Sequence, residues 1–170
     1  ETAIDALYAL AARTGAEETL DPVLRHAALS ALDRIGTVES AVARAGDGAF
    51  EVRLTALLFL RRHESPEAQR FLADSDPVIV REAVRAIYET AAVDGPAGDA
   101  LGSLKGKAAE LPAPLQRRLV AAHYRRGTAD HARGLLAIAG DEAFDGTVRE
   151  AALHALRLWE KQIDTDPVMG

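Results

Sequence analysis

A twelve-residue pattern occurs four times along this 170-residue chain. The copies span residues 21–32, 49–60, 76–87 and 145–156, and each has an apolar residue at position 4, alanine at position 8 and aliphatic residues at positions 9 and 12. Residues at these spacings lie on one face of a helix. The first three copies start 28 and 27 residues apart, and repetition at such a period predicts stacked helices.

The repeats predict an all-α chain that forms an α–α superhelix, a solenoid of antiparallel helix pairs with roughly four to six units and right-handed curvature. No segment alternates apolar and polar residues with period two over a useful length, so no sheet is expected. Periodicity and turn residues place the expected helices at residues 2–14, 21–35, 37–44, 49–63, 65–72, 76–90, 112–126, 128–138 and 147–161, with a weaker helix at 100–110.

Capping and turn residues mark the ends of several expected helices. Asp21 is expected to cap the helix that begins at Pro22, since the missing N–H of proline costs nothing in a first turn. Gly36 is expected to end that helix in a left-handed conformation, and Gly127 to stop a later helix. The stretch 93–106 has the least regular pattern because it contains Gly95, Pro96, Gly98, Gly102 and Gly106.

Composition and charge exclude several classes of function. The chain has no cysteine, which removes disulfides, thiol catalysis, zinc–thiolate sites and covalent haem attachment. Its net charge of −6 is opposite in sign to that of most proteins that bind duplex DNA. No apolar run approaches the ~20 residues that span a bilayer, so no membrane contact is expected from this segment.

Small residues within the repeat predict close packing of its helices. Alanine at position 8 lets two helices approach closely, so a larger residue in place of Ala28, Ala83 or Ala152 should overpack the stack.

Arginine occupies position 5 in three copies, as Arg25, Arg53 and Arg149, and Val80 interrupts the series. We interpret these arginines as a structural ladder that pairs with aspartates of neighbouring turns. A ligand-binding ladder is the alternative.

Three adjacent arginine pairs form the candidate partner surface. Two of the pairs lie near expected helix C-termini, where positive charge interacts favourably with the helix dipole, and this structural role is the simpler interpretation. On one shared concave face the pairs could instead hold a phosphate or an acidic protein surface. The six residues are Arg61, Arg62, Arg117, Arg118, Arg125 and Arg126.

The histidines do not follow a metal-binding pattern, because no two have the i, i+4 spacing of a helical metal site. Only His123 and His131 are close in sequence, on two helices expected to be consecutive. His63–Glu64 is a single dipeptide at an expected helix end, which is typical of a cap or a solvated end. No serine lies in a Gly-x-Ser-x-Gly elbow, and residues 102–107 lack the spacing of a phosphate-binding loop. We therefore assign no catalytic, cofactor-binding or metal-ligating residue.

The pattern Asp-x-x-Val-Arg-x-x-Ala-Leu-x-Ala-Leu resembles the HEAT repeat. It is most complete at residues 145–156, and residues 21–32 and 76–87 fit the same signature. The resemblance covers most of the chain and is weakest at 91–111. It implies a solenoid that presents a surface to other proteins.

Longer phrases at 21–28, at 52–62 followed by 68–86, and at 148–153 leading to 158–161 and 166–168 are similar to a narrower group. That group is the HEAT segment of large secreted proteins of planctomycete and verrucomicrobial type, which join it to a sugar (sorbosone) dehydrogenase-like β-propeller and a cytochrome c domain. The resemblance implies a helical spacer, without a cofactor of its own, in an extracytoplasmic or periplasmic oxidoreductase. A cytoplasmic location stays open. No catalytic or haem-ligating residue carries over, because the Cys-x-x-Cys-His motif is missing here.

We expect a single HEAT-repeat domain over residues 1–170 that acts as a monomeric, non-catalytic scaffold for a protein partner or for neighbouring domains of the same chain. The alternative is a HEAT-like nucleic-acid-binding enzyme of the DNA glycosylase type, and a HEAT protein like the chromophore lyases is a third reading. The ends of the sequence lead us to expect a fragment of a longer multidomain protein. Leu7, Tyr8 and Trp159 are expected to rest against neighbours outside it, as apolar ends.

Overall fold

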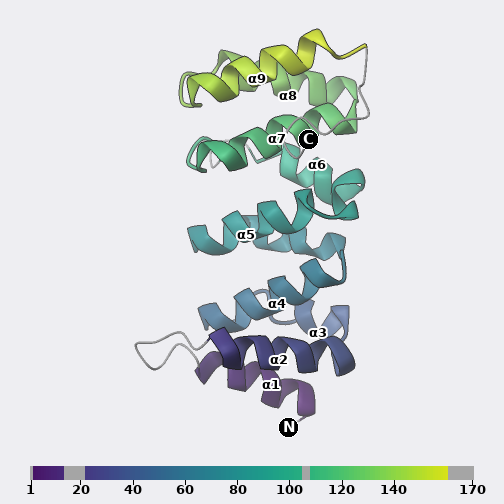
Figure 1. Ribbon diagram of the computed structural model, residues 1–170, viewed down its shortest axis with the longest axis vertical. Helices are drawn as coiled ribbons and strands as arrows, with labels where there is room; N and C mark the ends of the chain where they lie inside the picture. The colour runs from purple at the N-terminus through teal and green to yellow at the C-terminus, as the bar shows by residue number, and fades with distance from the viewer. Residues whose placement is uncertain (1, 14–21, 105–107, 161–170) are drawn as a thin grey trace. The chain divides into compact units, whose positions relative to one another are not determined.

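The computed structural model describes residues 2–13, 22–104 and 108–160, and its labelled helices are shown in Figure 1. Within these ranges the regular structure is entirely helical, without any strand, which confirms the expected all-α class. The chain divides into two compact units, residues 1–86 and 87–170, with the boundary inside helix α5.

Unit 1 is built around helix α4. Helices α1 and α2 pack against each other and both contact α4. Helix α3, which precedes α4, and the 3₁₀ helix η1, which follows it, also contact α4. The elements are α1 Ala3–Arg13, α2 Pro22–Ile35, α3 Val38–Val42, α4 Phe50–Arg62, η1 Pro66–Ala73 and α5 Pro77–Tyr88, of which the last continues into unit 2.

The central place of α4 follows from its sequence. Val52, Ala56, Leu57 and Leu60, at the four apolar positions of the repeat, are all buried, and Phe59 adds a buried ring. Full burial of an aliphatic side chain of this size contributes roughly 1.5–3 kcal/mol, so this face stabilises unit 1 through contacts with several elements at once.

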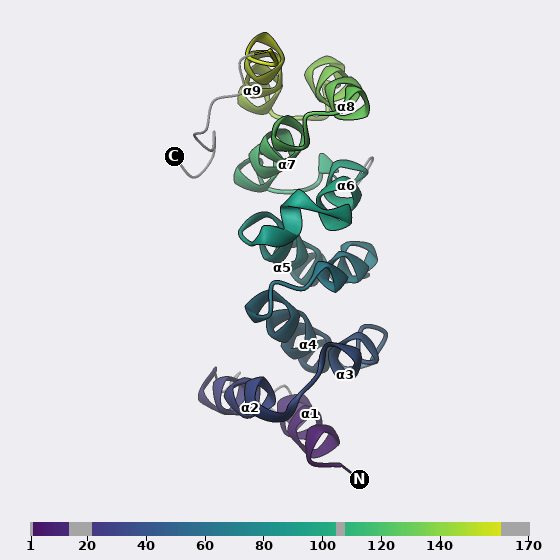
Figure 2. The same ribbon diagram turned by 90° about the vertical axis from the view of Figure 1, so that its right-hand side faces the viewer.

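Unit 2 is built around helix α7. This helix contacts the 3₁₀ helix η2 and the helices α6, α8 and α9, and α8 packs against α9 (Figure 2). Its elements are η2 Ala91–Asp94, α6 Pro96–Gly102, α7 Ala113–Arg126, α8 Ala129–Gly140 and α9 Gly146–Arg157. Val120 and Tyr124 of α7, Leu135 of α8, and Val148 and Ala152 of α9 form the core between the last three helices.

The repeat pattern identifies the buried helix face in the two inner copies. In the copies at 49–60 and 76–87 all four apolar positions are buried. In the first copy Leu24 is 40% exposed, and in the last copy Leu153 is 57% exposed. The pattern marks which side of the helix is apolar, while the helices that pack around it determine which of those residues are covered.

Gly127 and Gly36 are required for different reasons, the first for its backbone conformation and the second for close packing. Gly127 has a φ of 65°, in the left-handed region, and ends α7 as expected. The left-handed conformation expected for Gly36 is wrong, because Gly127 is the only one of the described glycines that has a positive φ. A Cβ on Gly36 would lie 2.7 Å from the Leu32 carbonyl oxygen and 3.1 Å from the Phe59 ring, so Gly36 is required by close packing against these groups.

The expectation of an irregular stretch at 93–106 is also wrong for its described part, which contains the end of η2 and helix α6. Pro96 stands in the first turn of α6, where its missing N–H costs nothing. Gly98 fits because a Cβ there would lie 1.9 Å from the Val93 carbonyl oxygen. The weak helix expected at 100–110 is not found as such, because α6 ends at Gly102. Residues 105–107 lie outside the described residues, and so does Asp21, the residue expected to cap the helix that begins at Pro22.

Candidate functional site

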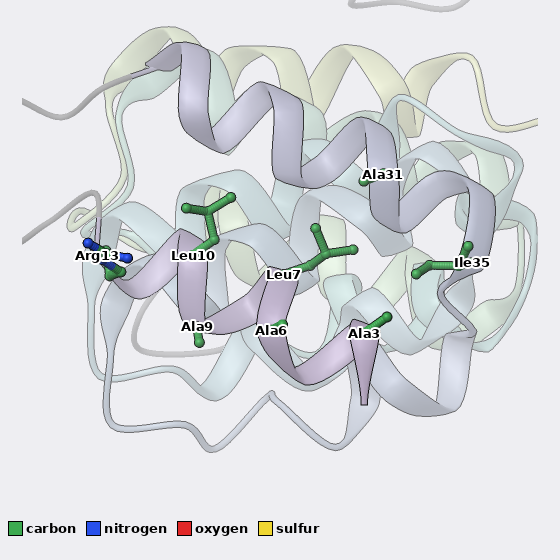
Figure 3. A pocket seen from close by; sticks show the side chains of 8 residues that line it. All are labelled: Ala3, Ala6, Leu7, Ala9, Leu10, Arg13, Ala31 and Ile35. Atoms are coloured by element: carbon green, nitrogen blue, oxygen red, sulfur yellow. The ribbon is translucent and has the colours of Figure 1, made fainter. Parts of the chain in front are cut away.

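An open apolar groove runs between α1 and α2 in unit 1 (Figure 3). Its volume is about 600 Å³. Leu7 and Leu10 extend from α1 toward α2, and Ile35 closes one end of the groove from the last turn of α2. The lining residues are Ala3, Ala6, Leu7, Ala9, Leu10, Arg13, Ala31 and Ile35.

The groove exists because helix α1 is apolar on two sides. One side buries Tyr8 and Ala11 completely inside unit 1. The other side presents Leu7 and Leu10, half-buried, at the i, i+3 spacing that places residues on one helix face. A surface helix normally has one apolar face against the core and one polar face. The second apolar face of α1 is therefore available to a further apolar surface.

The chemistry of the groove suits binding and offers no reacting group. Seven of its eight lining residues are alanine, leucine or isoleucine, and Arg13 at one end is the charged exception. Ile35 is 48% exposed, and Leu24 and Val23 on the same helix are 40% and 72% exposed. Exposed aliphatic side chains that line an open groove are a feature of interaction surfaces on soluble proteins.

The three residues expected at exposed apolar ends, Leu7, Tyr8 and Trp159, differ in their exposure. Leu7 does lie in an open surface, as expected. Tyr8 does not, because its ring is buried under the Arg44 guanidinium, 5.3 Å from the ring centroid. Trp159 is half-buried against the core of unit 2, with its ring centroid 6.2 Å from that of Tyr124.

The arginine pairs are each engaged with groups of their own unit. In unit 1 Arg61 lies 3.7 Å from Glu82, and Arg62 pairs with Asp33. In unit 2 all four arginines belong to α7. Arg118 pairs with Glu89 at 2.8 Å, Arg125 with Asp94 at 2.6 Å, Arg126 with Asp99 at 2.7 Å, and Arg117 donates to the Thr147 hydroxyl at 2.8 Å.

These contacts give the arginine pairs a role within the fold. The carboxylates lie on α2 and α5 in unit 1, and on η2, α6 and the turn after α5 in unit 2, so the ion pairs tie neighbouring elements together. An exposed pair such as Arg125–Asp94 contributes roughly 0–1 kcal/mol, whereas the side chains of Arg118 and Glu89 are only 16% and 18% exposed. A carboxylate beside each of Arg62, Arg118 and Arg126 also reduces the positive potential available to a phosphate. Their use as a partner surface stays a prediction.

Two of the position-5 arginines make structural contacts. Arg53 donates to Asp74 at 2.8 Å, where both side chains are nearly buried, and to the Asp47 carbonyl oxygen at 2.8 Å. Arg149 donates to the Ala139 carbonyl oxygen at 3.1 Å. These bonds join the start of each repeat helix to the adjoining turns, and they favour the structural interpretation of the ladder.

A buried histidine pair in unit 2 was not anticipated as a site. His123 of α7 and His131 of α8 are 5% and 7% exposed, and their Nδ1 atoms lie 2.9 Å apart. The other nitrogen of His131, Nε2, lies 2.9 Å from Oδ1 of Asp99 on α6. Asp99 also accepts two hydrogen bonds from Arg126, at 2.7 and 3.1 Å. The polar chain thus links three helices.

The surroundings of the pair shift the pKa values of His123 and Asp99. Burial, followed by the charge of His131, lowers the pKa of His123 from 6.5 to about 4. The hydrogen bonds from Arg126 lower the pKa of Asp99, and His131 adds to this effect. Asp99 is therefore an ionised acceptor near neutral pH, and His131 Nε2 carries a proton toward it.

Two glycines make room for the His123 ring. A Cβ on Gly134 of α8 would lie 2.2 Å from the ring carbon Cε1, and a Cβ on Gly102 of α6 would lie 3.0 Å from the same atom. The spacing of His123 and His131 around Gly127 was a usable signal, since a turn there places them on antiparallel helices. Asp99 gave no such signal, because its segment was expected to be irregular.

The described residues contain no group of three or more metal-binding side chains, and none of the described helices is long and apolar enough to cross a membrane. No family model, curated protein or solved structure matches the chain.

Proposed function

We propose that this chain is a non-catalytic, protein-binding module of the helical-repeat type, a HEAT-like solenoid, and that the groove between α1 and α2 receives an apolar helix of a protein partner. The open groove is the observation that carries the proposal, because aliphatic side chains line it and its volume is about 600 Å³.

The partner is a helix because the groove has the form that helices fill. Ala3, Ala6 and Ala9 line it with small side chains, which allow another backbone to approach closely. Within unit 1, other faces of α1 and α2 are covered by helix α4. A helix with apolar residues at i, i+3, i+4 and i+7 would cover the remaining face in the same way.

The positive charge of Arg13 at one end of the groove favours one orientation of the partner helix. Arg13 is exposed at the C-terminal end of α1, where its cation is also favoured by the helix dipole. A partner helix with an acidic residue beside Arg13 would gain a charge-assisted contact there. Because the rest of the lining is apolar, this contact orients the partner and the aliphatic residues contribute most of the affinity.

The wider setting of the module rests on the sequence resemblance alone. We propose that it spaces a propeller and a cytochrome domain in an extracytoplasmic, sugar dehydrogenase-like oxidoreductase. Under this proposal the helix that fills the groove belongs to a neighbouring domain of the same polypeptide or to a partner subunit, and the module holds no cofactor.

The groove is tested by photo-crosslinking and then by affinity. A photoreactive amino acid at Ala6 should capture one partner, whose binding is then titrated against the wild type, Leu10→Glu and the control His26→Glu. His26 is exposed on α2 and does not line the groove. We expect at least tenfold weaker binding for Leu10→Glu, because a carboxylate in an apolar contact is desolvated without a partner, and no change for His26→Glu. Equal affinities for the two variants would refute the groove as the binding site.

A further inference from the structure

The polar chain formed by His123, His131, Asp99 and Arg126 has no part in the proposed binding function, because it lies in unit 2 and the groove lies in unit 1. Buried polar networks that are fully satisfied rigidify a structure, whereas a buried group that loses its partner is costly. The question is how this network responds to a change in its protonation.

The distance between the two Nδ1 atoms limits the number of protons between them. At 2.9 Å one nitrogen must donate and the other must accept, so a single proton lies between the rings. His131 Nε2 carries another proton toward Asp99. A third proton can be added at His123 Nε2 without breaking the contact between the rings. A fourth protonates both Nδ1 atoms, which leaves two donors and two positive charges facing each other.

The packing prevents a small adjustment that would relieve this repulsion. Gly134 and Gly102 leave less room than a methyl group would need on two sides of the His123 ring. The ring of His131 is held from the other side by Asp99, which Arg126 holds in turn. The rings can separate only if α7 and α8 move apart or a ring leaves the core.

The described elements that contact α7 each carry charged groups. Asp99 on α6 compensates the first positive charge on the pair, but it already binds Arg126 of α7. On η2, Asp94 pairs with Arg125, and its carbonyl oxygen accepts from Arg126. On α8, Asp130 pairs with Arg133 at the surface, and on α9, Arg149 donates to the Ala139 carbonyl oxygen. Among the described residues, Asp99 is the carboxylate that contacts the pair.

We propose that the His123–His131 pair is a proton-sensitive contact that holds α6, α7 and α8 together while one proton lies between the two Nδ1 atoms, and that releases these helices when both rings are fully protonated. Acid therefore opens unit 2 at this point, and neutralisation closes it again. The contact acts independently of the groove in unit 1.

Nuclear magnetic resonance of the ¹⁵N-labelled full chain tests the contact directly. At neutral pH we expect a scalar coupling between the two Nδ1 nuclei across the hydrogen bond. Once the pH is low enough for both rings to be fully protonated, this coupling should disappear together with a change in Trp159 fluorescence and a loss of amide protection in α6, α7 and α8. Trp159 is the single tryptophan and lies in unit 2, so its emission reports this unit. Absence of the coupling at neutral pH, or its persistence after the helices open, would overturn the proposal.

A matched pair of variants separates this contact from general acid unfolding. His123→Asn keeps a donor near the position of Nδ1 but does not titrate, so the acid midpoint of the Trp159 signal should move down by about one pH unit or more. His154→Asn removes an exposed histidine of the same unit and should keep the wild-type midpoint. An unchanged midpoint in His123→Asn would overturn the proposal, and if that variant does not fold, the coupling in the wild-type chain decides.

Discussion

Replacing Gly134 by alanine sets two opposing effects against each other in helix α8. Alanine is favoured over glycine inside a helix by about 1 kcal/mol, so helix propensity predicts stabilisation. The added Cβ would lie 2.2, 2.7 and 2.8 Å from Cε1, Nδ1 and Nε2 of His123, well inside contact distance. The ring must move, which costs about 1–3 kcal/mol in overpacking. Its Nδ1 contact with His131 is then lost inside the core, which costs about 1–3 kcal/mol more.

The packing terms outweigh propensity, and we expect Gly134→Ala to lower the free energy of unfolding of unit 2 by about 1–5 kcal/mol. Urea unfolding followed by Trp159 fluorescence measures this change, since the tryptophan packs against Tyr124 in the same unit. Gly140→Ala is the matched control in the same helix, because nothing lies within 4 Å of its added Cβ. If Gly134→Ala proves as stable as the wild type or more stable, the ring does not occupy the place described and the reasoning fails.

Three further outcomes are expected. Because the pKa of His123 is lowered to about 4 in the folded chain, the unfolded chain binds a proton at this residue more readily between pH 6.5 and about 4. The free energy of unfolding should therefore decrease by about 3 kcal/mol as the pH falls across this window. A urea titration in which His123→Asn shows the same decrease as the wild type would contradict this. Ala83→Leu should lower stability by about 1–3 kcal/mol, because Ala83 is fully buried, and an unchanged melting temperature would contradict the assigned repeat register. The chain should not bind duplex DNA at ~0.15 M salt, because its net charge is −6 and three of its α7 arginines pair with carboxylates. Salt-dependent binding in a fluorescence anisotropy titration would instead support the nucleic-acid alternative.

Repetition made the helical class and the buried helix face predictable. The apolar positions at 52, 56, 57 and 60 are covered as the pattern predicts, because a helix with apolar residues at those spacings has one face that avoids water. The same pattern failed for Leu153, which is 57% exposed. Periodicity reports the composition of a face, and Leu153 has the right composition without a helix to cover it.

The candidate sites were less predictable than the helices. The arginine pairs were visible in the sequence, but their carboxylate partners stand 21 to 31 positions away on other elements, so that Arg118 meets Glu89 and Arg62 meets Asp33 only after packing. The groove depends on two faces of α1, and an apolar pattern does not show which of these faces another helix covers. The coverage of Tyr8 and the openness of Leu7, its neighbour in sequence, illustrate the difference.

Local chemistry along the chain was therefore sufficient for the all-α class, for most helix limits and for the left-handed turn at Gly127, because periodicity and capping act over a few neighbouring residues. The histidine pair required three helices to meet. His123 and His131 face each other because Gly127 reverses the chain, because Gly102 and Gly134 leave room for a ring, and because α6 brings Asp99 within 2.9 Å. Burial and the neighbouring charge, which lower the pKa of His123, arise only in that assembled environment, since both depend on groups that are distant in the sequence.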